Sequence, residues 1–371
     1  MISKGKVNFV NVDKSEFYSV LKERVNDYFV NRGITPYANA FMVFKIFFFL
    51  AGLIGIYLLL ILANLSLPVS YLLWAALGLF TAFAGVNIGH DAIHGAISKN
   101  KKVNKILGFI FDIAGANGYL WDITHNQIHH TYTNIPEYDE DVNISPMIRL
   151  STHQKRRQIH RFQHWYTLFL YCLTSLSWVF LKDYKRFFSS KIGIHRIKKP
   201  PWYQYFYLFF FKTVYYTVFL VLPLLLIDFT WWQILLGFLL MHAFEGFALA
   251  IIIQLAHMVK GVDFPLPDQS GDIKSSWAIH QLRTTADYAR SNPVVSFFFG
   301  GLNFHIEHHL FQRVCHVHHK SISKIVERTA MEFSLPYHDI PTLGKALQSH
   351  ISHLKSLGTL KQRDIQYVSN S

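Results

Sequence analysis

The sequence predicts an all-α integral-membrane protein, with four transmembrane helices in two hairpins and a cytoplasmic helical cap. Three observations predict this fold. Hydrophobic residues make up 51% of the 371 residues and lie in long blocks, and a block of about 20 apolar residues can cross a bilayer. The short turn inside each hairpin contains no Lys or Arg, and the segments outside the hairpins are strongly basic, as cytoplasmic loops are.

The N-terminal segment, residues 1–37, is expected to be cytoplasmic, because it has no apolar core of the signal-peptide type. Residues 13–30 have the pattern of an amphipathic helix, with Asp13 or Ser15 as the expected N-cap. Such a helix lies on the membrane surface or packs against the body of the protein. The membrane domain is therefore expected to begin at about residue 38.

Four apolar blocks have the length of transmembrane helices. The expected spans are residues 41–63, 71–88, 203–227 and 231–256. Lys45, near the start of the first span, is its only charged residue. Two further apolar segments, 106–120 and 165–181, are short or interrupted, so we expect them to be interfacial or re-entrant.

The distribution of charge predicts the topology. The turns at 64–70 and 228–230 contain no Lys or Arg, whereas the residues that give a formal net charge of +13 lie on the other side of the spans. The positive-inside rule then places both termini and the large loops in the cytoplasm. Basic chains also bind nucleic acid, but charges placed between membrane blocks favour a membrane role without nucleic acid. The expected organisation is an N-terminal segment, a membrane domain at 38–335 and a cytoplasmic tail at 336–371.

Three histidine clusters follow the apolar blocks. Their sequences are GHDAIH at 89–94, HNQIHH at 125–130 and HIEHH at 305–309. In each cluster two histidines are three or four positions apart and so share one face of a helix. Imidazole binds iron, zinc, copper and nickel, and eight histidines exceed what one ion uses, so the pattern predicts two metal ions. The eight residues are His90, His94, His125, His129, His130, His305, His308 and His309.

Other histidines carry weaker signals. His257 ends the fourth expected span, at the level where the first cluster ends the second span, but a histidine in this position is as often a helix cap as a ligand. A single HxxxH pattern also occurs by chance, whereas three clusters on one side of a membrane point to metal. His316, His318 and His319 follow the third cluster, and we expect them to form a polar amphipathic surface.

These clusters resemble the three histidine boxes of the membrane fatty acid desaturase superfamily. The segments NIGHDAIHG, THNQIHHTYTN and GLNFHIEHHLF are each similar to a family box with its usual neighbours. The resemblance covers residues 38–335 and implies that the eight box histidines bind two iron ions, with His257 completing the set. The QLAH stretch that ends at His257 is similar to the front-end and sphingolipid-type branch, although His305 stands where that branch usually has Gln.

The resemblance also implies an activity. The chain is expected to be an O₂-dependent desaturase that introduces a C=C double bond into a long acyl chain of a membrane lipid or an acyl-CoA. The sequence contains no HPGG haem motif, so we expect a separate electron donor, a ferredoxin or a cytochrome b5. The pattern looks most like short bacterial acyl desaturases, which implies a bacterial cytoplasmic membrane with the active site on the cytoplasmic side.

Few carboxylates accompany the histidines, unlike the Glu-rich sites of soluble di-iron bundles. We expect Asp91 and Glu307 to hold ligand imidazoles in one tautomer, and residues 139–141 to be surface charges. An acyl tunnel is expected among the aromatic residues, for which the candidates are Tyr119, Trp121 and Trp277.

Polar residues inside the fourth span need a separate explanation. His242 and Glu245 are costly at bilayer depth, and a structural pairing is favoured over a role in the tunnel or toward an electron donor. Lys212, on the third span, is the expected partner.

Two other functions fit parts of the pattern. A hydroxylase, epoxidase or ketolase of the same superfamily has the same boxes and differs in the fate of oxygen. A histidine-rich metal transporter belongs to another class, but transporters bind their substrates near the membrane midplane, and these clusters lie beyond the ends of the spans. A zinc hydrolase needs an open three-ligand site with a general base, and no HExxH motif is present.

Overall fold

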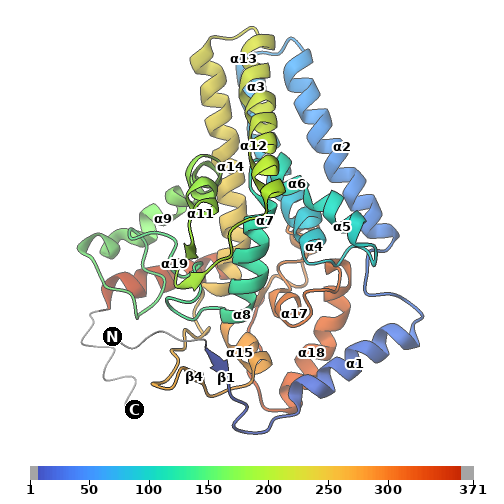
Figure 1. The fold of residues 1–371 in the computed structure, drawn as a ribbon, viewed down its shortest axis with the longest axis vertical. Helices are drawn as coiled ribbons and strands as arrows, with labels where there is room; N and C mark the ends of the chain where they lie inside the picture. The colour runs from blue at the N-terminus through green and yellow to red at the C-terminus, as the bar shows by residue number, and fades with distance from the viewer. Residues whose placement is uncertain (1–6, 361–371) are drawn as a thin grey trace.

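The computed structural model describes residues 7–360, which are mostly helical. Within these residues four helices are long and apolar enough to cross a membrane: Ala40–Leu62, Leu67–Ile93, Trp202–Leu226 and Trp231–His257. The predicted all-α fold with four membrane helices is therefore confirmed. Figure 1 shows these helices in the upper part of the molecule, with both hairpin turns at the top and the remaining helices gathered below.

The membrane helices begin where side chains cap them. The Asn39 side chain accepts a hydrogen bond from the Met42 N–H at the start of the first span, and Thr230 and Gln233 form a capping box at the start of the fourth. The four spans consist of α2 (Ala40–Leu62); α3 (Leu67–Ala84), η1 (Gly85–Gly89) and α4 (His90–Ile93); α12 (Trp202–Tyr216), η5 (Thr217–Val221) and α13 (Leu222–Leu226); and α14 (Trp231–His257).

The helices α3 and α14 pack directly on each other because glycines allow close approach. A Cβ at Gly78 of α3 would lie 2.0 Å from the carbonyl oxygen of Met241 on α14. A Cβ at Gly237 of α14 would lie 2.3 Å from the Trp74 ring on α3. Small residues at such contacts are typical of helix pairs in membranes. These two helices lead directly to the first histidine cluster and to His257.

Apart from the two hairpin turns at 63–66 and 227–230, the other described residues, 7–39, 94–201 and 258–360, form the cap. Its helices are α1 (Phe17–Asn31), α5 (Lys101–Gly108), α6 (Ile110–Ile113), α7 (Gly118–Trp121), η2 (Asp122–His129), α8 (His130–Tyr132), η3 (Gln158–Phe162), α9 (Gln163–Tyr171), α10 (Thr174–Ser177), η4 (Trp178–Lys182), α11 (Asp183–Phe187), α15 (Trp277–Thr284), α16 (Pro293–Phe298), α17 (His305–Leu310), η6 (His316–His318), α18 (His319–Glu332) and α19 (Leu343–Thr359).

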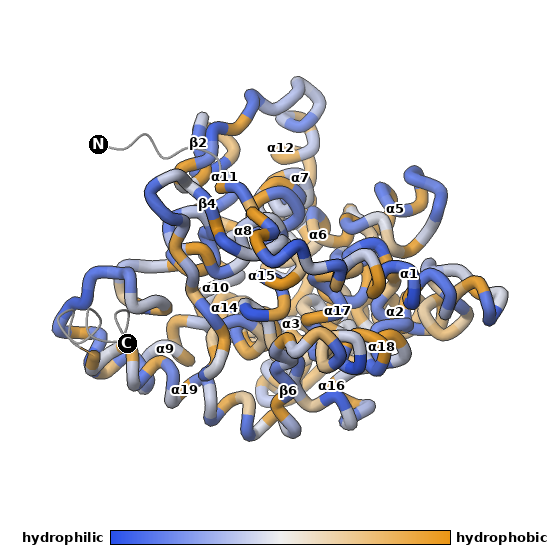
Figure 2. Tube along the Cα trace, turned by 90° about the horizontal axis from the view of Figure 1, so that it is seen from below, coloured by the Kyte–Doolittle hydropathy of each residue, from blue (hydrophilic) through white to orange (hydrophobic). Residues whose placement is uncertain are grey.

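Three short strand pairs lie in the cap; the first and third join distant parts of the chain, and the second is a local hairpin. They are β1 (Asn8–Phe9) with β4 (Asp272–Ile273) in parallel, β2 (Lys191–Ile192) with β3 (His195–Arg196) in antiparallel, and β5 (Asp287–Tyr288) with β6 (Asp339–Ile340) in parallel. Seen from below, α8, α15 and α17 lie near the middle of the cap, and hydrophilic segments dominate the loops at its rim (Figure 2).

The amphipathic helix near the N-terminus is α1, which starts at Phe17 with Glu16 at the N-cap position instead of the expected Asp13 or Ser15. Its buried face joins a core cluster with residues of α15, α17 and α18, so the helix packs against the body of the cap. The residues on this face are Phe17, Leu21, Val25 and Phe29.

The segment from α9 to α11, at 163–187, is amphipathic. Every fourth residue is buried: Gln163, Thr167, Tyr171, Ser175, Val179, Asp183 and Phe187. The opposite face exposes large apolar side chains, among them Trp165, Phe169, Leu173, Phe180 and Leu181. An exposed apolar stripe of this kind is typical of a helix in the plane of a membrane interface, the arrangement expected for residues 165–181.

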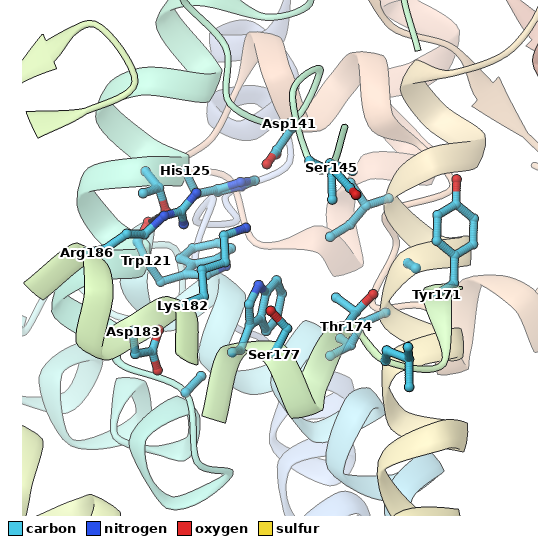
Figure 3. A pocket seen from close by; sticks show the side chains of 18 of the residues that line it. Trp121, His125, Asp141, Ser145, Tyr171, Thr174, Ser177, Lys182, Asp183 and Arg186 are labelled. Atoms are coloured by element: carbon cyan, nitrogen blue, oxygen red, sulfur yellow. Dashed lines mark hydrogen bonds between the residues drawn. The ribbon is translucent and has the colours of Figure 1, made fainter. Parts of the chain in front are cut away.

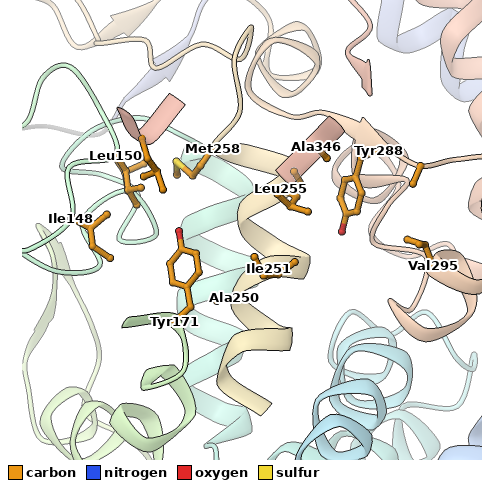
Figure 4. Close-up of a cluster of buried hydrophobic side chains, with 14 residues drawn as sticks. Ile148, Leu150, Tyr171, Ala250, Ile251, Leu255, Met258, Tyr288, Val295 and Ala346 are labelled. Carbon is orange, nitrogen blue, oxygen red and sulfur yellow. The ribbon is translucent and has the colours of Figure 1, made fainter. Parts of the chain in front are cut away.

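The lower end of α14 is enclosed by a buried cluster. Figure 4 shows Tyr171, Leu255, Met258 and Ala346 together in this cluster, which ties α9, α14 and α19 to each other. The expected C-terminal tail therefore contains a helix, α19, that packs into the cap. The last part of that tail, residues 361–371, lies outside the described residues.

Candidate metal centre

The first histidine cluster lies where the second membrane span ends. Between α3 and α4 the chain makes a π-helical turn, in which the His90 N–H donates to the carbonyl oxygen of Gly85, five residues earlier. A Cβ at Gly89 would lie 2.5 Å from the Ile110 side chain, so glycine is needed for this turn to pack on the cap. The rings of His90 and His94 then lie 4.7 Å apart. Single π-helical turns of this kind are frequent at functional sites.

The second cluster lies on another π-helical segment, η2. The His130 N–H donates to the carbonyl oxygen of His125, so residues five apart lie one above the other. An α-helical turn would direct only His125 and His129 to one side, whereas this wider turn adds His130. The ring centroid of His125 lies 5.3 Å from that of His129 and 4.5 Å from that of His130.

The third cluster is brought to the membrane helices by a glycine turn. Gly300 has a φ of +61°, which favours glycine, and a Cβ there would lie 2.5 Å from the carbonyl oxygen of Val86 on the second span. The following helix, α17, therefore starts beside the end of that span. His257 is the last residue of α14, and its ring lies 4.5 Å from the ring of His305.

The nine predicted histidines meet in one place, where they form two groups of four with His130 between them. In each group the four nitrogen atoms lie within 4.8 Å of one another, and all residues are buried. The Nε2 atom of His130 lies 3.1 Å from that of His125 and 3.0 Å from that of His308. The first group is His90, His94, His125 and His308, and the second group is His129, His257, His305 and His309.

Oxygen atoms hold the outer ring nitrogen of every histidine in the second group. These oxygens belong to carbonyl, carboxylate or amide groups and can only accept, so each Nδ1 carries the proton and each Nε2 keeps a lone pair. The acceptors are Asp139 for His129 (3.0 Å), the Thr284 carbonyl for His257 (3.2 Å), the Leu302 carbonyl for His305 (3.1 Å) and the Gln281 side chain for His309 (2.7 Å).

The inner nitrogens fit metal ligation. The Nε2 atom of His257 lies 3.2 Å from that of His129 and 2.8 Å from that of His305, and facing lone pairs repel unless a cation lies among them. In the first group both ring nitrogens of His90 and the Nε2 atom of His94 are buried without a hydrogen-bond partner. Folded proteins normally satisfy such atoms, so both groups have the donor set of a metal site.

Electrostatics keeps most of these imidazoles neutral. Burial, followed by neighbouring imidazoles, holds the pKa values of His94, His125, His308 and His309 well below the usual range. Neutral imidazole is the form that binds metal. His129 differs: burial alone would lower its pKa, but the adjacent Asp139 carboxylate outweighs burial, and the pKa is raised.

Asp91 lies beside the first group, and its two carboxylate oxygens face different histidines. Its Oδ1 atom lies 3.6 Å from the Nδ1 atom of His90, while its Oδ2 atom accepts hydrogen bonds from the backbone and the ring of His316 at 3.0 and 2.8 Å. The ammonium group of Lys45, in the first span, donates to the other ring nitrogen of His316 at 2.7 Å. The expected polar surface is therefore wrong, because the histidines concerned are buried: His316, His318 and His319.

The predicted Glu307 has different surroundings. Its carboxylate accepts a hydrogen bond from the Tyr337 hydroxyl (2.9 Å), which also contacts Asp287 (2.7 Å), and within residues 7–360 it forms no hydrogen bond or ion pair with an imidazole. Asp139 instead holds a histidine of the second group. It is 1% exposed and also accepts the Asp141 N–H, so the expectation of a surface charge is wrong for Asp139.

Inside the membrane helices, the expected pairing of Lys212 with His242 and Glu245 is also wrong. The Nδ1 atom of His242 lies 2.9 Å from the Ser175 hydroxyl and 3.5 Å from the Glu245 carboxylate. Lys212 pairs instead with Asp183, at 2.9 Å. Asp183 belongs to α11, whose position next to the third span is set by the tertiary fold.

A pocket of about 320 Å³ adjoins the first histidine group (Figure 3). His125 forms part of its wall, and the Trp121 ring stacks on His125 with centroids 4.0 Å apart. Of the other aromatic candidates, Tyr119 lines a different pocket, and the Trp277 ring N–H donates to the His130 carbonyl at 3.0 Å. Much of the wall is apolar, with Leu120, Ile148, Trp178, Leu249 and Ile253.

Known proteins share this sequence pattern. The family model of fatty acid desaturases matches residues 66–341. An acyl-lipid (8-3)-desaturase of Physcomitrium patens is 34% identical over 97% of this chain and 75% of its own length. An sn-1 linoleoyl-lipid 6-desaturase of Synechocystis sp. (strain ATCC 27184 / PCC 6803 / Kazusa) is 33% identical over 96% of this chain and 99% of its own length. An acyl-lipid (8-3)-desaturase of Mortierella alpina is 31% identical over 92% and 78%, respectively.

Proposed function

The chain belongs to the fatty acid desaturase family, and we propose that it is an integral-membrane enzyme that uses O₂ to introduce a C=C double bond into the acyl chain of a lipid at a pair of iron ions. The observation that carries this proposal is the meeting of two groups of buried histidines beside a largely apolar pocket. The names of the relatives refer to acyl-lipids, which favours a lipid ester over an acyl-CoA as substrate.

The proposed iron ligands are nine histidines, namely the two groups of four and His130 between them. When bound, the iron pair supplies the O₂-dependent oxidising chemistry that an unactivated methylene requires and that side chains lack. The protein orients the ligands: the acceptors on the Nδ1 atoms fix each ring of the second group with Nε2 facing inward. The nine proposed iron ligands are His90, His94, His125, His129, His130, His257, His305, His308 and His309.

The pocket beside His125 is proposed to hold the acyl chain. Its volume of about 320 Å³ is within the range of small-molecule sites. Trp121 and Trp178 supply flat apolar walls that exclude water, and Leu249 and Ile253 of α14 line it as well. The methylene groups of a chain bound here would lie next to the first histidine group.

Topology and electron supply complete the proposal. The hairpin turns lack Lys and Arg, whereas the cap carries the basic loops, so the cap is assigned to the cytoplasmic side, in a bacterial cytoplasmic membrane. Electrons are assigned to a separate ferredoxin or cytochrome b5, since basic surfaces of the cap are complementary to acidic donors.

Expression in a desaturase-deficient bacterial host tests the function. Lipids from aerobic cells should contain a new alkene at a defined position, and anaerobic cells should contain none. His94→Ala, His129→Ala and His308→Ala should abolish the product at an unchanged level of protein in the membrane. The control is His153→Ala, because His153 is exposed and lies outside both groups. A hydroxy acid without any alkene would refute the assignment.

A further inference from the structure

The pocket beside the histidines changes in polarity along one wall. Among the residues that the segment from α9 to α11 contributes to this wall, five lie one turn apart: Leu170, Thr174, Trp178, Lys182 and Arg186. The series therefore runs from an apolar side chain to two cations. An acyl ester has the same polarity, with a hydrocarbon tail at one end and oxygen atoms at the other.

Lys182 is the cation of this wall without a direct partner. Figure 3 shows its side chain reaching into the pocket that His125 also lines. Within residues 7–360 its ammonium group forms no hydrogen bond or ion pair, and it lies 5.7 Å from the centroid of the Trp178 ring. Burial lowers the pKa of Lys182 to about 8, as expected for a charge that has lost water without gaining a full partner.

Of the carboxylates around Lys182, two are already paired with other cations. The carboxylates act on its charge from a distance, but each has another contact closer to it. Asp183 pairs with Lys212 at 2.9 Å, Glu140 pairs with Arg186, and Asp141 lies 3.6 Å from the Nδ1 atom of His129. Arg186 is thereby neutralised, and Lys182 is left as the cationic hydrogen-bond donor of this wall that is available to a ligand in the pocket.

We infer that Lys182 binds the carboxyl end of the acyl substrate by donating a hydrogen bond to its ester carbonyl oxygen, and so fixes which methylene lies beside the histidine groups. The inference rests on the proposed function. The carbonyl is the strong acceptor nearest to the hydrocarbon chain in any acyl ester, whatever the head group. With this end held at Lys182 and the tail directed toward Leu170 and Ile253, the double bond is placed at a fixed count from the carbonyl.

The test uses the iron-loaded, full-length enzyme in lipid nanodiscs, with a phosphatidyl ester as the first substrate and the acyl-CoA thioester of the same chain as the second. Lys182→Met should raise KM for the phosphatidyl ester at least about tenfold, the loss expected for a charge-assisted hydrogen bond, and should spread the alkene over several positions. Lys182→Arg should keep one position. The matched control is Lys185→Met, because Lys185 is exposed and does not line the pocket.

Each outcome decides the inference. Spread positions and a raised KM in Lys182→Met, with iron per chain unchanged, support it. A single unchanged position with the wild-type KM overturns it, and so does loss of iron together with product, because Lys182 would then act on the fold. Preference for the thioester over the phosphatidyl ester would identify the acceptor as a thioester carbonyl. Alkene formation by the wild type is measured separately. Failure of the proposed function is therefore distinguishable from failure of Lys182 to bind the ester carbonyl.

Discussion

At the scale of single residues, the second histidine group is distinguished by the charge of one acceptor. Three of its histidines donate to neutral oxygens, whereas His129 donates to the Asp139 carboxylate at 3.0 Å. Asp139 is almost fully buried, and backbone N–H groups of Asn134 and Asp141 hold it in place. A fixed carboxylate behind an imidazole raises the basicity of the ligand and sets its orientation. Asp139 should therefore be a determinant of iron affinity.

Asp139→Asn tests this role, because the amide keeps the size of the side chain and removes the charge. Iron affinity should fall about 10–100-fold, measured as iron per chain across a chelator series, while the amount of protein in the membrane stays unchanged. Asp27→Asn is the control, because Asp27 is exposed on α1 and belongs to neither histidine group. Wild-type iron retention in Asp139→Asn would remove Asp139 from the metal site.

The sequence predicts the histidines of the site better than the residues that support them. HxxxH spacing has a local cause, because neighbouring turns of one helix present the pair together. Asp139 instead follows His129 by ten residues in a loop without periodicity. His316 is buried by contacts with Asp91 and Lys45, which are 225 and 271 positions away in the chain. Local patterns cannot report such long-range contacts.

At the scale of elements, the site differs from the expected regular α-helices because two of its histidine clusters lie on π-helical turns. The expected second span ended at residue 88, because polar residues follow it, but the helix continues to Ile93. Those polar residues face the protein interior, where the buried histidines meet, so the helix has no reason to end. The turn before His90 and the turn that contains His125 depend on tertiary packing, which hydrophobic periodicity does not encode.

Gly78 provides a test at this scale, because it sets the distance between the two helices that lead to His90 and His257. Gly78→Ala places a Cβ 2.0 Å from the Met241 carbonyl oxygen, so α3 and α14 must separate. Overpacking typically costs about 1–3 kcal/mol, and a lower Tm in detergent with reduced iron content is expected. Gly55→Ala is the matched control, because no atom lies within 4 Å of that Cβ. Equal Tm values for the two variants would contradict the close contact.

At the scale of the whole molecule, the metal centre joins the membrane helices to the cap. Its groups combine α4, at the end of the second span, and the end of α14 with η2 and α17, which are distant in the chain. The four membrane helices could be predicted because bilayer thickness fixes the length of each apolar block. The cap could not be predicted in detail, because its short helices are positioned by one another rather than by their own periodicity.

Iron removal should therefore loosen the cap more than the membrane helices. Without a cation, the Nε2 atoms of His257 and His305, 2.8 Å apart, repel each other, whereas the apolar spans keep their packing. A ligand that binds only the folded state stabilises it by about 2.7 kcal/mol at 100 times its Kd, so the chelated protein should unfold at a lower temperature. Hydrogen exchange should speed up in η2 and α17 and stay slow in α2.

Adding Fe(II) under reducing conditions should restore slow exchange and a stoichiometry of two ions per chain, because there are two groups of four ligands. A double variant with His94→Ala and His125→Ala, which removes half of the first group, should retain one ion and protect α17 less fully than the wild type. If the chelated and loaded proteins exchange at the same rates in every segment, the cap is held by its own packing, and the histidines do not link it to the membrane through metal.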